Sequence, residues 1–255
     1  MHSDLALLKS AAQEAGEIAL SYFRNNPKSW LKSASSSVSE ADMAVDAYLK
    51  DKLLLARQNY GWLSEETTDT RHRLTIKHVF VADPIDGTRG FLQGSEDWCI
   101  SLAVIEDGVP KAAVVHAPAL NKTYSAERGH GAFCNEQKLP GAMVVDFDEM
   151  QVSGTAIEPW SLFLRCHKVA PIPSLALRLA RVASGELAAA FSRPNAHDWD
   201  IAGAHLLLEE AGGLLIDGQG NIPFYNRQEL KHPALGAFGA KARIFLESSR
   251  HAAII

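Results

Sequence analysis

The sequence predicts a mixed α/β fold in two halves, and three observations lead to that prediction. Two segments with helical periodicity precede residue 60, short β-branched segments follow up to about residue 133, and helices alternate with strands from about residue 151. At about 150 residues per domain, a chain of 255 residues allows one large domain or two small ones. We therefore expect residues 1–150 and 151–255 to be two halves of one unit that share a core.

The N-terminal segment predicts two helices separated by a polar stretch. The first helix should end near Asn25-Asn26-Pro27, because apolar residues recur before that point at three- and four-residue intervals: Leu5, Leu8, Ala12, Ala15, Ala19 and Tyr22. Residues 28–38 are polar and rich in serine, which indicates a loop or a weak hairpin. The second helix should begin at Ser39-Glu40-Ala41-Asp42, because a serine followed three residues later by an acid is a capping box.

The middle and C-terminal parts of the chain predict the strands and the remaining helices. Short segments rich in β-branched residues and bounded by turn residues are expected to be strands of a buried sheet: residues 60–63, 79–82, 100–105, 112–116, 122–126 and 131–133. After residue 151 we expect helices at 174–184 and 201–211, with strands at 188–191 and 214–216.

Composition limits the classes of function. A net charge of −5, from 30 acidic and 25 basic residues, gives no electrostatic reason to expect a nucleic acid or an anionic membrane as partner. The chain has no apolar run of about 18 residues, and charges interrupt its first apolar stretch, so neither a membrane span nor a signal peptide is expected. Cys99, Cys134 and Cys166 form no CxxC pair, which favours the cytoplasm over a disulfide framework or a zinc site.

The strongest functional signal is the run Asp83-Pro84-Ile85-Asp86-Gly87-Thr88, which directly follows an apolar strand. Two carboxylates held this close repel each other unless a cation lies between them. Oxygen ligands without His or Cys favour Mg²⁺ over zinc, and the Ile85 carbonyl is a natural further ligand. The amide groups of Gly87 and Thr88, at a plausible helix start, would form an anion site beside the metal.

Each acid of this region also has an ordinary structural explanation. Asp-Pro and Asp-Gly are common turn dipeptides. Glu65 and Glu66 could be solvated loop acids, Asp198 or Asp200 could cap the following helix, and Asp42 belongs to its capping box. Aspartyl-phosphate phosphatases are a poor alternative, because their D-x-D-G-T motif has one residue between the acids and this chain has two.

Further segments accompany this run, namely SEAD at 39–42, LSEE at 63–66, ERGHGAFCN at 127–135 and WDIAGAHLLLEEAGG at 199–213. Together they resemble the inositol monophosphatase family of metal-dependent, lithium-sensitive phosphatases, in the family's order and over nearly the whole chain. The resemblance implies a five-layered αβαβα sandwich with the metals between its halves. It also implies a homodimer.

The resemblance implies a set of metal ligands. Glu65 would ligate the first ion together with Asp83 and the Ile85 carbonyl. Asp83 would bridge to a second ion, which Asp86 and Asp200 complete. The cofactor expected in this site is Mg²⁺, as two or three ions.

Roles in catalysis and substrate binding follow from the same likeness. Asp42 and Thr88 resemble the pair that, with Glu65, orients and deprotonates the attacking water. The amides of Gly87 and Thr88 would hold the phosphate.

The substrate-binding set comprises Asp86, Gly87, Thr88, Arg193 and Asp200. Arg193 departs from the family, because many inositol phosphatases have an acid near this position that contacts inositol hydroxyls. A guanidinium there puts inositol recognition in question and favours a substrate with additional negative charge.

These observations indicate a Mg²⁺-dependent phosphomonoesterase that hydrolyses a small phosphate ester with a metal-activated water. Inositol-1-phosphate or a related sugar phosphate is the first substrate class, and a 3′(2′),5′-bisphosphate nucleotide is the second. A regulatory, partner-binding protein that keeps the fold is the alternative from another class. The complete set of acids argues against that alternative, because a protein without activity should have lost some of them.

Overall fold

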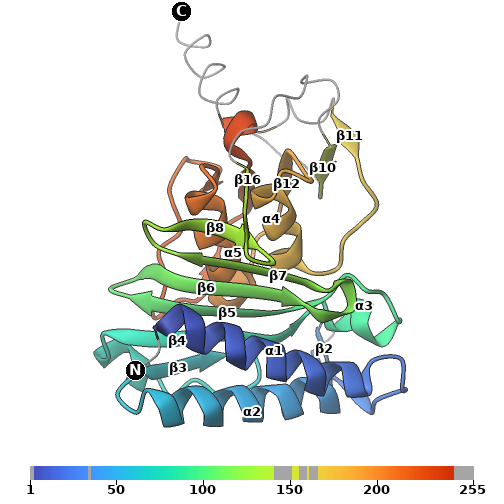
Figure 1. The fold of residues 1–255 in the computed structure, drawn as a ribbon, viewed down its shortest axis with the longest axis vertical. Coiled ribbons are helices and arrows are strands. Elements are labelled where there is room, and N and C mark those ends of the chain that lie inside the picture. Colours follow the sequence, from blue (N-terminus) through green and yellow to red (C-terminus); the bar gives the residue numbers. More distant parts are fainter. Residues whose placement is uncertain (1–2, 34–35, 141–150, 155–159, 161–165, 244–255) are drawn as a thin grey trace, which may run out of the picture.

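Successive layers of helices and β-sheets make up the part of the chain that the computed structural model describes (Figure 1). That part comprises residues 3–33, 36–140, 151–154, 160 and 166–243. In Figure 1, a helical layer at the bottom is followed by a first sheet, a second helical layer and a second sheet. A helical turn at residues 240–243 lies beyond the second sheet. This alternation confirms the α/β class and agrees with the expected αβαβα order.

The first helical layer consists of α1 (Asp4–Tyr22) and α2 (Glu40–Ala56), which cover the same face of the first sheet. Serine side chains cap both helices, and at α2 the pair Ser39 and Asp42 forms the predicted capping box. Between the helices, β1 (Ser29–Ser33) and β2 (Ser36–Ser39) pair antiparallel. The serine-rich stretch is therefore the hairpin that the sequence allowed, not the loop.

The first sheet has the strand order β3-β4-β5-β6-β7-β8-β9, with β3 and β4 parallel and the other pairs antiparallel. Its strands are β3 (Gly61–Ser64), β4 (His78–Asp86), β5 (Cys99–Glu106), β6 (Val109–Ala117), β7 (Lys122–Glu127), β8 (Gly131–Cys134) and β9 (Gln137–Lys138). The connections contain the short helices η1 (His72–Thr75), α3 (Thr88–Leu92) and η2 (Pro118–Leu120). The predicted strands are confirmed, and β4 is longer than expected because it continues through the acidic motif.

The second helical layer consists of α4 (Leu175–Ala183) and α5 (Asp198–Glu210), which contact each other and the first sheet. The second sheet has the order β11-β10-β12-β16-β14. Its strands are β10 (Gln151–Ser153), β11 (His167–Lys168), β12 (Ala189–Phe191), β14 (Leu214–Asp217) and β16 (Leu235–Phe238). A separate antiparallel pair, β13 (Ala196–His197) with β15 (Lys231–His232), lies beside the start of α5.

Among the described residues, three clusters of buried apolar side chains hold these layers together. The first joins α1 and α2 to the first sheet and includes Leu49 and Phe80. The second joins the first sheet, α4, α5 and the second sheet, and includes Val81 and Leu207. The third includes Phe238 of the second sheet and Ala242 of the helical turn beyond it. The two halves of the chain thus share a core.

The predicted junction between the halves, near residues 141–151, lies almost entirely outside the described residues. The first sheet uses strands between residues 61 and 138, and the second uses strands between residues 151 and 238. The division into residues 1–150 and 151–255 stays a prediction. None of the helices in the described ranges is long and apolar enough to cross a lipid bilayer.

Candidate active site

Glu65 and Asp83 lie side by side because β3 runs parallel to β4 and ends opposite Ala82, the residue before Asp83. Ser64 of β3 pairs with Ala82 of β4, so the next residue of each strand follows in register. The Glu65 amide donates a hydrogen bond to the Ala82 carbonyl at 3.3 Å, which continues the alignment by one residue. Strand register therefore brings together two acids that are distant in the sequence.

Pro84 explains how the motif turns after its first acid. Proline has no amide N–H, and the pairing of β4 with β5 becomes irregular between Asp83 and Asp86. Gly87 then has a φ of 96°, in the left-handed region that glycine tolerates, and a Cβ there would come within 3.2 Å of Ser174. Helix α3 begins at the next residue, so the amides of its first turn have no acceptor within the helix.

Asp200 reaches the same region from the first turn of α5. This helix begins at Asp198 rather than at residue 201, and its N-cap is His197, so neither acid is the cap that the sequence allowed. Asp200 instead accepts a hydrogen bond from the His197 amide at 2.7 Å. Asp198 is fully buried and accepts hydrogen bonds from the His232 ring at 2.7 Å and the Asn226 amide at 2.8 Å. These contacts fix the turn that carries Asp200.

Gly203, one turn further along α5, allows the helix to approach the first sheet closely. A Cβ at this position would lie 3.0 Å from Ser101 Oγ and 3.2 Å from the Leu102 carbonyl oxygen. A larger side chain would therefore push the helix away from β5, and Asp200 would move with it.

Glu65, Asp83 and Asp200 are the acids that the structure brings together as a possible metal site. One carboxylate oxygen from each lies within 4.8 Å of the others. Burial, reinforced by repulsion between the acids, raises the pKa of Glu65 to about 7 and the pKa values of Asp83 and Asp200 well above their usual range. Three converging oxygen donors without a sulfur or imidazole ligand fit a hard cation such as Mg²⁺.

Asp86 lines the same cavity but does not belong to that close group. Its Oδ2 accepts hydrogen bonds from Ser174 Oγ at 2.6 Å and from the Ala176 amide at 2.5 Å, at the N-terminus of α4. Burial raises the pKa of Asp86, whereas these hydrogen bonds and the nearby charge of Arg178 lower it. The contact between Ser174 and Asp86 is not evident from the sequence, although a serine before an apolar helix marks Ser174 as its N-cap.

Asp42 and Thr88 meet in the structure. Thr88 Oγ1 lies 2.9 Å from Asp42 Oδ1 and 2.9 Å from the Ile85 carbonyl oxygen. The other oxygen of Asp42 accepts hydrogen bonds from the Ser39 amide at 2.8 Å and the Ser39 hydroxyl at 2.5 Å. Burial raises the pKa of Asp42. One carboxylate oxygen therefore serves the capping box, and the other contacts Thr88.

Lys32 of the β1–β2 hairpin places a positive charge beside these acids. Its Nζ lies 3.6 Å from Glu65 Oε1 and forms a closer ion pair with Glu66. The ammonium group lowers the pKa of Glu65 and so opposes the effect of burial. The sequence contains no signal for this contact, because nothing in a serine-rich stretch shows which lysine turns toward distant acids.

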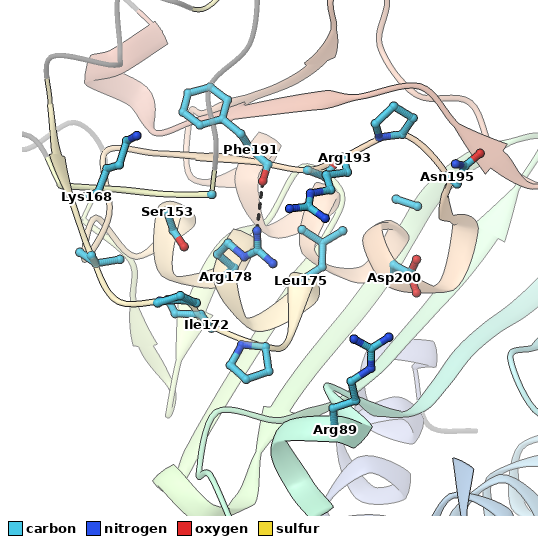
Figure 2. Close-up of a pocket in the computed structure, with 17 residues that line it drawn as sticks. Arg89, Ser153, Lys168, Ile172, Leu175, Arg178, Phe191, Arg193, Asn195 and Asp200 are labelled. Atoms are coloured by element: carbon cyan, nitrogen blue, oxygen red, sulfur yellow. Dashed lines mark hydrogen bonds between the residues drawn. The ribbon is translucent and has the colours of Figure 1, made fainter. Parts of the chain in front are cut away.

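Two adjoining cavities surround the site. The smaller, of about 320 Å³, is lined by Ser37, Glu65, Asp83, Ile85, Asp86, Gly87, Thr88, Arg89, Pro173 and Asp200. The larger, of about 770 Å³, shares Arg89, Pro173 and Asp200 with the first and extends to Arg193 (Figure 2). Arg193 thus lies on the wall of the neighbouring cavity, outside the one that contains the acids.

Comparison with known proteins gives a match to the model of the inositol monophosphatase family over residues 1–248. The chain belongs to this family. This inositol monophosphatase family member is 34% identical over 229 residues to the inositol-1-monophosphatase of Rhizobium meliloti. The alignment covers 83% of this chain and 81% of that protein. It is 30% identical over 230 residues to the Nus factor SuhB of Xylella fastidiosa, and the alignment covers 84% of this chain and 82% of that protein.

A solved structure supports the same conclusion. The extragenic suppressor protein suhB from Bartonella henselae aligns with a TM-score of 0.81 and 26% identity, over 95% of this chain and 96% of that one. The family and its fold are therefore confirmed as the sequence predicted them. Because members of the inositol monophosphatase family are phosphatases, the prediction of a hydrolase is confirmed as well.

Proposed function

We propose that this chain is a Mg²⁺-dependent phosphomonoesterase acting on a small phosphate ester. The convergence of the Glu65, Asp83 and Asp200 carboxylates carries the proposal. We assign two or three Mg²⁺ ions to the site. Glu65, Asp83 and the Ile85 carbonyl would hold the first ion, and Asp83, Asp86 and Asp200 would hold the second.

The side chains of the protein would prepare the attacking water. Bound Mg²⁺ would make a water acidic near neutral pH and would neutralise charge on the phosphate. When the Thr88 hydroxyl donates to Asp42 Oδ1, its oxygen lone pairs are available to accept a proton from that water. The raised pKa of Asp42 makes it a better final acceptor of the proton. Glu65 would accept a further hydrogen bond from the water and orient it.

The backbone beside these groups would hold the phosphate. The amides of Gly87 and Thr88 stand at the start of α3, where a helix has donors without internal acceptors. Asp86 and Asp200 would contact the same phosphate through the metal. In this proposal the phosphorus would lie between the anion donors and the residues that prepare the water.

Inositol-1-phosphate or a related sugar phosphate is the first substrate class, because relatives of this chain carry the name inositol-1-monophosphatase. A 3′(2′),5′-bisphosphate nucleotide is the second, and Arg193 on the cavity wall favours it. A regulatory protein with this fold is the alternative from another class, and the name of the relative Nus factor SuhB points toward it.

The remaining features of the proposal concern the protein as a whole. A cytoplasmic location is supported by Cys99 and Cys134, which form no disulfide in the described part of the chain. A homodimer and inhibition by lithium follow from the likeness to the family. Size-exclusion chromatography and millimolar lithium in the phosphatase assay test these two points.

Phosphate release from a panel of small esters tests the proposed activity. We expect activity with Mg²⁺, none in excess EDTA, and a kcat at least about a hundredfold lower in Asp83→Asn, because removing a ligand charge weakens metal binding. Circular dichroism should show that the variant is folded. Full activity of the wild type in excess EDTA would refute the metal-dependent mechanism.

A further inference from the structure

The larger cavity beside the acids differs from the rest of the molecule in its charge. Cationic side chains line it at Arg89, Lys168, Arg178 and Arg193, and Asp200, shared with the metal site, is the acid among its lining residues. The chain as a whole has a net charge of −5, so this concentration of positive charge is local. In Figure 2, Arg193 lies above Arg178, which stands near the centre, Arg89 extends from below, and Asp200 lies to the right.

Neighbouring residues hold the side chain of Arg178 in place. It is partly buried, and its Nη1 donates a hydrogen bond to the Phe191 carbonyl at 3.0 Å. Its Nε is buried without a hydrogen-bond partner among the described residues. Gly154 makes room for the guanidinium, because a Cβ there would lie 3.3 Å from Nη1. Burial lowers the pKa of Arg178, since a desolvated cation is less stable, and the charge of Asp86 opposes that effect.

Arg193 and Lys168 are exposed on the cavity wall. Within the described ranges, no carboxylate forms an ion pair with Arg178, Arg193 or Lys168. Asp198, five residues after Arg193, accepts hydrogen bonds from the His232 ring and the Asn226 amide. The side chains of Arg178, Arg193 and Lys168 therefore have no ion-pair partner among the described residues, although Asp200 lines the same cavity.

We propose that this cavity is a second anion subsite, and that the substrate is a phosphate ester carrying another anionic group, held by Arg193 with Arg178 and Lys168. The proposal rests on the proposed function, because it places the scissile phosphate in the adjoining cavity of acids. Guanidinium groups offer donors in a planar fork that matches phosphate or carboxylate. A neutral polyol also needs acceptors, and Asp200 is the carboxylate among the lining side chains.

Matched pairs of esters test the proposal. Adenosine 3′-monophosphate and adenosine 3′,5′-bisphosphate differ by one phosphate, whereas glycerol 2-phosphate and 2-phosphoglycerate differ by one carboxylate. For each pair, the measured quantity is the ratio of kcat/KM for the more anionic ester to kcat/KM for its partner. This ratio cancels effects on the metals and the attacking water. We expect a ratio of about ten or more in at least one pair, and the responding pair identifies the anion.

Variants of Arg193 then show whether the cavity is responsible. We expect Arg193→Gln to lower that ratio about tenfold, the effect of losing one charged hydrogen bond, and Arg193→Lys to retain most of it. Arg227→Gln, an exposed arginine that does not line the cavity, should leave the ratio at the wild-type value. A wild-type ratio near one in both pairs, or the same ratio in Arg193→Gln, would overturn the subsite.

Failure of the subsite and failure of the proposed function give different results. Hydrolysis of the esters with no preference for the more anionic one removes the subsite and leaves the phosphatase intact. If the wild type releases phosphate from none of the four esters with Mg²⁺, the proposed function fails. Calorimetric titration of the metal-free protein with the two adenosine phosphates then decides the subsite. The subsite is supported if the wild type binds the bisphosphate more tightly than the monophosphate and Arg193→Gln removes that difference. Equal affinity of the wild type for the two compounds refutes it.

Discussion

Asp42 shows at the scale of one residue how a structural and a chemical role can coexist. Its Oδ2 accepts from both the amide and the hydroxyl of Ser39, while its Oδ1 lies 2.9 Å from Thr88 Oγ1. The capping box alone would explain a buried acid at this position. The contact with Thr88 is not needed for capping, and it connects the start of α2 to the acidic motif at the end of β4.

Substitution of Asp42 and Thr88 separates the two roles. Asp42→Asn keeps an oxygen for the capping box but cannot take up a proton, so we expect kcat to fall at least about a hundredfold with about 1 kcal/mol or less of lost stability. Thr88→Ala should lower kcat similarly and leave substrate binding within about tenfold. Steady-state kinetics and thermal melting measure both effects. Normal kcat with a lowered Tm in Asp42→Asn would show that the acid only caps α2.

Elements predicted well from the sequence have local signals. The capping box of α2 and the turn at Gly87 depend on residues within a few positions of each other, so the pattern suffices. β4 was predicted too short because its last residues are acids and a proline, which have low strand propensity. Pairing of Asp83 and Asp86 with β5 outweighs that propensity.

The parts of the site that the sequence did not reveal depend on contacts between distant elements. Lys32 reaches Glu65 from a hairpin, and Arg178 reaches the cavity wall from α4. Each lysine or arginine has the same local appearance as others on the surface. Only the packing of the second half against the first places these cations, and no periodic pattern encodes that packing.

The β1–β2 hairpin supplies a positive charge close to the proposed metal site. The Lys32 ammonium lies 3.6 Å from Glu65 Oε1, so it would compete with a bound Mg²⁺ for that carboxylate. We expect Lys32→Gln to lower the Mg²⁺ concentration for half-maximal activity about two- to fivefold, the range for a partly exposed ion pair. Lys28→Gln, an exposed lysine just before the same hairpin, is the control. A higher Mg²⁺ requirement in Lys32→Gln would instead mean that the ammonium helps to form the site.

At the scale of the whole molecule, the acids of the site oppose folding when no cation is present. Glu65, Asp83 and Asp200 keep protons in the native protein at pH values where the unfolded chain has released them. Stability that depends on such raised pKa values is lost as the pH increases. His116 and His205, whose pKa values burial lowers to about 4, act in the opposite direction, but only below about pH 6.5.

The window between pH 6.5 and 8 therefore isolates the acids. In EDTA we expect the Tm to fall as the pH rises through this window. Each proton that only the native state retains lowers the free energy of unfolding by about 1.4 kcal/mol per pH unit. For a protein of this size that corresponds to about 2–4 °C per unit. Saturating Mg²⁺ should abolish the slope, and Asp83→Asn should reduce it in EDTA. A Tm that rises with pH in EDTA would contradict the raised pKa values. Differential scanning fluorimetry is sufficient for the measurement.

Helix α4 links the two cavities through its first turns. The Ala176 amide binds Asp86, and Arg178, two residues further on, lines the larger cavity and is attracted by the charge of Asp86. A cation bound at Asp86 would weaken that attraction and leave the guanidinium available to an anion. Heterotropic cooperativity follows. If bound Mg²⁺ raises the affinity of the cavity for an anion by some factor, the bound anion raises the affinity for Mg²⁺ by the same factor. The substrate of such a protein would help to load the metal that acts on it.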